Sequence, residues 1–132
     1  MKCGDIIKVK NYVFLDGQVD NNDFERRCIV LFEDNDKVCV CPIISLLSSF
    51  NNNPNNYYLL PLVRKNRRNF SFAKLNSITF INKEDVISIS DFLTNKCMIG
   101  IINKIKKNYL NYKNNEYYEE ALNKIEEKIA VK

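Results

Sequence analysis

Hydrophobic residues in the first ninety positions of the chain fall into short runs that polar segments separate. The run at 28–32 is uninterrupted, which is typical of a strand buried on both faces. Similar runs predict further strands at 6–15, with a break near Lys10, and at 38–44, 57–63, 77–81 and 86–89. Because so few residues separate these runs, they indicate antiparallel pairing in a small barrel rather than βαβ units.

The hydrophobic period changes in the last third of the chain. Leu93, Cys97, Ile101 and Ile105 are spaced four residues apart, which predicts an amphipathic helix over 91–110.

A second stripe predicts a helix over 115–131 and contains Tyr118, Leu122, Ile125 and Ile129. This stripe is narrow, so we expect the helix to pack along the surface or against a partner. The sequence therefore predicts a single domain, mainly β with C-terminal helices, whose barrel covers about 4–90.

Composition narrows the chemistry. The 132 residues include no histidine, which excludes Ser-His-Asp and Cys-His nucleophiles and histidine metal sites. Three glycines are too few for a glycine-rich phosphate loop, and we expect neither a metal nor a cofactor. The chain has five cysteines and no C-x-x-C pair, which favours reduced thiols that pack in the core. Cys39 and Cys41 would nevertheless lie on the same face of a strand. No apolar stretch is long enough to be the core of a signal peptide or a membrane span, so we expect a cytoplasmic protein.

Charge is placed unevenly along the chain. Residues 1–63 carry six basic and eight acidic side chains, whereas residues 64–132 carry fourteen and eight. The segment 64–74 has no acidic residue and includes Phe70 and Phe72. Cations that neutralise phosphates, interleaved with rings that stack on bases, suit an extended strand of nucleic acid. The alternative is a solvated basic hairpin whose two phenylalanines join the core. The candidate nucleic-acid contacts in this segment are Arg64, Lys65, Arg67, Arg68 and Lys74.

The order of several short motifs resembles the PemK/MazF family of type II toxin–antitoxin toxins. A Gly4-Asp5-Ile6-Ile7 opening is followed by a loop with Gly17-Gln18, and Arg27 then precedes the apolar run. The next run ends in Pro42-Ile43-Ile44-Ser45, and the segment 82–89 resembles an acidic motif that precedes the family's C-terminal helix. The resemblance covers about residues 4–110.

This resemblance implies an SH3-like barrel that forms a homodimer, binds an antitoxin protein and cleaves single-stranded RNA without metal. Cleavage would proceed through attack by the ribose 2′-hydroxyl. Arg27 matches the arginine that stabilises the transition-state charge, Ser45 a hydroxyl position and Glu84 an acidic position, and Gln18 is a candidate RNA contact.

The chain also departs from the family pattern. Ile44 stands where the family has its catalytic threonine, and Ile87 where many relatives have an arginine. These departures leave open a non-catalytic barrel that binds nucleic acid or a partner protein. A third alternative is a mobile-element or phage protein that uses the barrel as a scaffold. Arg27 could then be a surface arginine, and Ser45 a helix cap.

Overall fold

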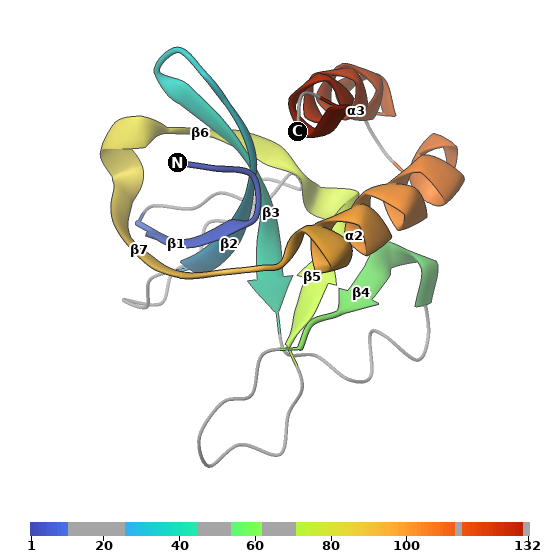
Figure 1. The fold of residues 1–132 in the computed structure, drawn as a ribbon, viewed down its shortest axis with the longest axis horizontal. Helices are drawn as coiled ribbons and strands as arrows, with labels where there is room; N and C mark the ends of the chain where they lie inside the picture. Colours follow the sequence, from blue (N-terminus) through green and yellow to red (C-terminus); the bar gives the residue numbers. More distant parts are fainter. Residues whose placement is uncertain (11–25, 45–53, 62–70, 113–114, 131–132) are drawn as a thin grey trace.

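The computed structural model describes residues 1–10, 26–44, 54–61, 71–112 and 115–130. Within these ranges the chain forms one mainly antiparallel sheet followed by two helices (Figure 1). The strands are β1 (Asp5–Val9), β2 (Arg26–Asp34), β3 (Lys37–Ile44), β4 (Tyr57–Leu59), β5 (Phe72–Lys74), β6 (Thr79–Asn82) and β7 (Val86–Phe92).

The strand order is β4-β5-β3-β2-β1-β7, and β6 pairs with β3 outside this path. β3 has room for both partners because its first half pairs with β6 and its last two residues pair with β5. The 3-10 turn Lys83–Asp85 joins β6 to β7, and these two strands curve around β1 and β2 (Figure 1).

The central strands β2 and β3 are buried on both faces, as the uninterrupted apolar run predicted. Ile29 of β2 and Cys41 of β3 pack in the larger core, on the side of the helices. Val30 and Val40, which alternate with them, pack in a smaller second core with Ile7 of β1. Sheet alternation therefore supplies both cores from the same two strands.

Backbone hydrogen bonds of Gly4 connect the beginning of the chain to the segment just before the first helix. Its φ of +96° lies in the left-handed region, and an added Cβ would lie 3.1 Å from the carbonyl oxygen of Leu93. The Gly4 amide donates to the Val30 carbonyl (2.8 Å), and its own carbonyl accepts from the Leu93 amide (2.8 Å). Only glycine fits this close approach without strain.

Helix α2 (Asn95–Asn108) begins at a Thr94 cap, whose hydroxyl accepts a hydrogen bond from the Cys97 amide (3.2 Å). The predicted stripe is confirmed, since Cys97, Ile101 and Ile105 are buried in the larger core. The predicted start at residue 91 is wrong, because residues 91 and 92 still belong to β7. A 3-10 turn, Tyr109–Asn111, follows the helix.

Helix α3 (Asn115–Ala130) packs against its own chain. Tyr118, Leu122 and Ile125 of the predicted stripe are buried in the larger core, beside α2 and the sheet. The Tyr118 hydroxyl is fully buried; it donates to the Leu75 carbonyl (2.7 Å) and accepts from the Ile78 amide (3.4 Å). These three members of the stripe are thus covered within one protomer, and the side chain of the fourth, Ile129, lies outside the described residues.

Several strands differ from the sequence prediction. The strand predicted at 77–81 begins at Thr79, because Leu75–Ser77 forms a 3-10 turn, and the one predicted at 86–89 extends to Phe92. β4 ends at Leu59, whereas the run predicted a strand to residue 63, of which 62 and 63 lie outside the described residues. β5 lies inside the segment interpreted as a basic RNA-binding stretch and was not predicted. Its three residues are too few to show a period. No helix in the described part of the chain is long and apolar enough to cross a membrane.

Candidate functional site

Arg27 lies near the start of β2, where the β1–β2 register pairs it with Lys8. Alternation along β2 places it on the same face as Ile29, at the margin of the larger core. The side chain is half-buried, and its Nη2 donates to the Ser71 hydroxyl oxygen at 3.5 Å. The neighbouring Arg26 instead donates from Nη1 to the Ile43 carbonyl at 3.2 Å.

Ser71 reaches Arg27 because of two successive strand pairings. The β2–β3 register places Cys28 opposite Pro42, and the end of β3 then pairs Ile44 with Phe72. Ser71, which precedes Phe72, is 1% exposed. Its carbonyl accepts from the Leu60 amide (2.9 Å), which fixes the backbone of this residue. We call Arg26, Arg27, Ile43, Ile44 and Ser71 the Arg27 corner.

Sequence reasoning missed Ser71 as a partner of Arg27. The only signal was a small polar residue between two phenylalanines, in a segment interpreted from its charges. Ile44 has no hydroxyl, but position 44 is not the only place from which a hydroxyl can reach Arg27. A hydroxyl lies beside Arg27 after all, but it comes from the neighbouring segment of the chain.

Glu84 lies away from this corner. It is exposed on the 3-10 turn Lys83–Asp85, whose Asp85 carbonyl accepts from the Lys10 amide (3.0 Å). Val9 of β1 pairs with Val86 on one side and with Arg26 on the other. Glu84 is therefore separated from the arginines by the width of β1, and no described residue forms an ion pair with it.

Lys74 ends β5, opposite Tyr57. Alternation puts it on the sheet face opposite Ser71, and its carbonyl accepts from the Cys41 thiol (3.3 Å). The structure thus does not bring Arg27, Glu84 and Lys74 together. Phe72 is 2% exposed and belongs to the packed interior, as the alternative interpretation predicted, so its ring does not offer a stacking surface.

Phe70 and the other predicted site residues lie outside the described residues. These site residues are Gln18, Ser45, Arg64, Lys65, Arg67 and Arg68. Their attachment points are nevertheless informative. The segment 11–25 ends at Arg26, the segment 45–53 begins after Ile44, and the segment 62–70 ends at Ser71. Each of the three segments therefore has one of its two ends at the Arg27 corner.

The cysteines pack as predicted. Cys28, Cys39, Cys41 and Cys97 are buried, and all five cysteines are free thiols. Burial raises the pKa of the Cys28 thiol to about 12, although the nearby Arg26 opposes this shift. Burial also raises the pKa of Cys39 and Cys41. These thiols stay protonated at neutral pH, and no metal-ligating cluster of three or more groups occurs among the described residues.

A comparison of the sequence with models of known protein families finds no match, and a comparison with curated proteins finds no relative. The resemblance to the toxin family therefore rests on the motifs and their order alone.

Proposed function

We propose that the protein is an SH3-like barrel that binds single-stranded RNA at the Arg27 corner and cleaves it as a toxin-type endoribonuclease. One observation carries the proposal. The half-buried Arg27 lies beside a hydroxyl, at the corner where one end of each of the segments 11–25 and 62–70, which contain most of the predicted RNA contacts, meets the sheet.

The strand connections support the SH3-like architecture. The path β7-β1-β2-β3 continues to β6, and a 3-10 turn links β6 back to β7. A five-stranded SH3-like barrel has the same strand order, and β4 and β5 would be an insertion between its third and fourth strands. The described sheet is not closed, since β6 pairs with β3 and β7 with β1. The motif order supports the more specific PemK/MazF type.

The chemistry that fits this corner is attack of a ribose 2′-hydroxyl on the adjacent phosphorus. The new O2′–P bond forms as the P–O5′ bond breaks, which leaves a cyclic phosphate and a 5′-hydroxyl. The 2′ proton passes to water, because Glu84 lies across β1 from this corner, and the leaving O5′ takes up a proton from solvent. Arg27 is permanently charged, and its partly desolvated guanidinium stabilises the negative charge that develops on the phosphoryl oxygens.

A non-catalytic RNA-binding barrel is the second candidate, and one observation favours it. Ser71 is 1% exposed, so its hydroxyl reaches Arg27 but not a substrate. With Ile44 at the threonine position, a substrate-facing hydroxyl would have to come from Ser45. The homodimer, the antitoxin partner and the cytoplasmic location are likewise proposals that rest on the resemblance.

Binding and cleavage are tested separately. Affinity for a fluorescent single-stranded RNA should fall with salt, with a log–log slope of about −0.7 per phosphate neutralised. Neutralising Arg67 and Arg68 together should make that slope shallower by about 1 to 1.5. Cleavage is assayed with chelator present, and its products should carry 5′-hydroxyl ends. RNA binding without cleavage would leave the second candidate, and the absence of salt-dependent binding would overturn both.

A further inference from the structure

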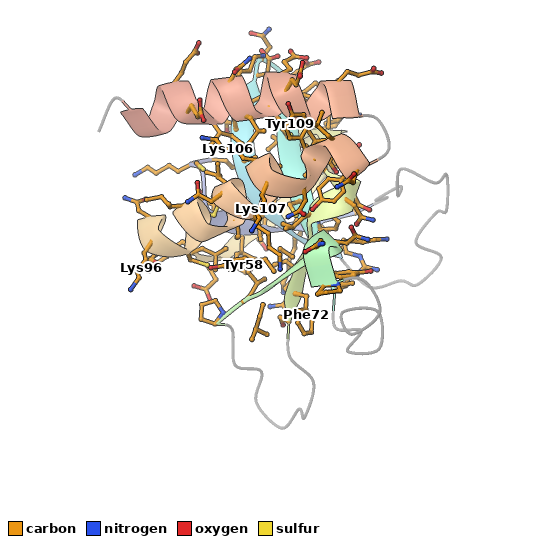
Figure 2. All side chains as sticks on the ribbon, turned by 90° about the vertical axis from the view of Figure 1, so that its right-hand side faces the viewer. Tyr58, Phe72, Lys96, Lys106, Lys107 and Tyr109 are labelled. Atoms are coloured by element: carbon orange, nitrogen blue, oxygen red, sulfur yellow. The ribbon has the colours of Figure 1, made fainter. Side chains whose placement is uncertain are left out.

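A groove of about 580 Å³ lies between the sheet edge at β4 and the first half of α2. Figure 2 shows this side of the molecule, with Tyr58 below α2 and Lys96 at the N-terminal end of the helix. The groove is separate from the Arg27 corner, because none of the residues that define that corner lines it. Its lining is Tyr58, Leu59, Leu60, Pro61, Thr94, Lys96, Cys97, Ile99 and Gly100.

The groove has a fixed floor and apolar rims. Tyr58 lies so close to Gly100 that an added Cβ there would be 2.3 Å from the tyrosine hydroxyl. Glycine therefore allows the ring to pack directly on the helix. On the rims, Leu59 is 50% exposed and Ile99 is 47% exposed. Two large apolar side chains thus face solvent on either side of one depression.

The backbone of β4 offers hydrogen bonds along the same groove. Among the described residues, β4 is the edge strand of the sheet and pairs only with β5. The Leu60 amide donates to the Ser71 carbonyl, so Leu60 and Tyr58 are the residues that exchange hydrogen bonds with β5. Alternation then directs the Leu59 amide and carbonyl away from β5, toward the open edge.

The charged side chains around the groove indicate which kind of ligand it would bind. The 14 residues of α2 include four lysines and no acidic residue. Lys96 is exposed and lines the groove itself. Lys107 is exposed farther along the helix, whereas Lys106 is paired with Glu126 of α3. The surface beside the groove therefore complements an acidic ligand.

We propose that this groove binds an extended peptide of a partner protein that carries a large apolar residue close to an acidic one. The peptide adds a strand to the edge of β4 through the Leu59 backbone. Its apolar side chain fills the space between Leu59 and Ile99, and its carboxylate pairs with Lys96. This site is independent of RNA cleavage at the Arg27 corner.

A displayed library of random octapeptides, selected on the full chain, tests the proposal. We expect enrichment of sequences with a large apolar residue within three positions of Asp or Glu. The double variant Leu59→Asp/Ile99→Asp should abolish binding of a selected synthetic peptide. Leu110→Asp is the matched control, because Leu110 is 69% exposed on the 3-10 turn after α2 and outside the groove.

Two further measurements test the charge and the backbone contacts. Lys96→Glu should weaken the selected peptide at least about fivefold and shift the preferred flanking residue from acidic to basic. N-methylation of the peptide residue opposite Leu59 should also weaken binding. Failure to enrich such peptides, or equal binding to the folded double variant, would overturn the proposal. The proposal would also be overturned by a double variant that loses RNA binding or dimerisation but still binds the peptide. In that case the groove has another occupant.

Discussion

The Nη2 atom of Arg27 lies 3.5 Å from the hydroxyl oxygen of Ser71, a residue 44 positions further along the chain. This contact links the predicted catalytic cation to a residue that the motif comparison did not select. Because Ser71 is buried and its backbone is hydrogen-bonded to Leu60, it presents a fixed hydroxyl to the guanidinium. We therefore regard Ser71 as a positioning residue for Arg27.

Replacing Ser71 with alanine should lower RNA cleavage about tenfold, the effect of about 1.4 kcal/mol, which is typical of one hydrogen bond to a charged group. RNA affinity should stay within about twofold, and Ser71→Thr should restore cleavage because it keeps the hydroxyl. Ser77→Ala is the matched control, since Ser77 is also buried. Equal losses in the Ser71→Ala and Ser77→Ala variants would show that Ser71 acts on stability alone.

The Tyr118 hydroxyl fixes α3 to the sheet. Tyr118→Phe removes the donor to the Leu75 carbonyl and the acceptor of the Ile78 amide, and it leaves both backbone groups buried. We expect urea titration to show a loss of about 1–3 kcal/mol in the free energy of unfolding. Tyr109→Phe, which removes a solvent-exposed bond to Glu119, should change it by less than about 0.5 kcal/mol. A Tyr118→Phe protein as stable as the wild type would contradict the buried contact.

Stability should depend on pH mainly on the alkaline side. The pKa of Cys28 rises to about 12 in the folded protein, so the folded chain keeps a proton that the unfolded chain releases near its ordinary value of 9.0. The unfolding free energy should therefore fall as pH rises from about 9 to 12. The fall should be smaller in Cys28→Ala. Urea titrations at several pH values measure this, and they should show little change between pH 6 and 8 because the chain has no histidine.

The proposed homodimer needs a surface other than Tyr118, Leu122 and Ile125 of the α3 stripe, which are buried within the protomer. The edge strand β7 provides one, since Ile87, Ile89 and Phe92 are 46%, 57% and 69% exposed. Light scattering at tens of micromolar should give the mass of a dimer, and Ile89→Lys should give a monomer. Leu110→Lys is the control, because Leu110 is equally exposed on the 3-10 turn after α2. A monomeric wild-type protein would contradict this prediction.

Long periodic segments were predictable from the sequence. The apolar run at 28–32 and the four-residue spacing of Cys97, Ile101 and Ile105 each bury a continuous face, so the pattern determines the element. β5 was not predictable, because three residues show no period and the surrounding cations suggested a solvent-exposed segment. The start of α2 was placed too early, because Leu93 extends the apolar spacing back into the end of β7.

The candidate site was predictable only in part. Arg27 could be found because it directly precedes a strongly apolar run. Its contact with Ser71 could not, because it depends on the register of β2 with β3 and on the pairing of β3 with β5. Glu84 was grouped with Arg27 by motif order, but β1 lies between them. Side chains from distant strands meet through register, which a local pattern does not encode.

The most direct test of the account compares RNA cleavage by the wild type, Arg27→Ala and Arg26→Ala, with single-stranded RNA affinity measured in parallel. The account predicts that the wild type produces RNA fragments with 5′-hydroxyl ends. In Arg27→Ala the cleavage rate should fall at least about 100-fold, while RNA affinity should stay within about threefold of the wild-type value. Arg26→Ala should keep most of the activity, because Arg26 donates to the Ile43 carbonyl instead. Cleavage that survives undiminished in Arg27→Ala, or a wild type that neither cleaves nor binds RNA, would contradict it.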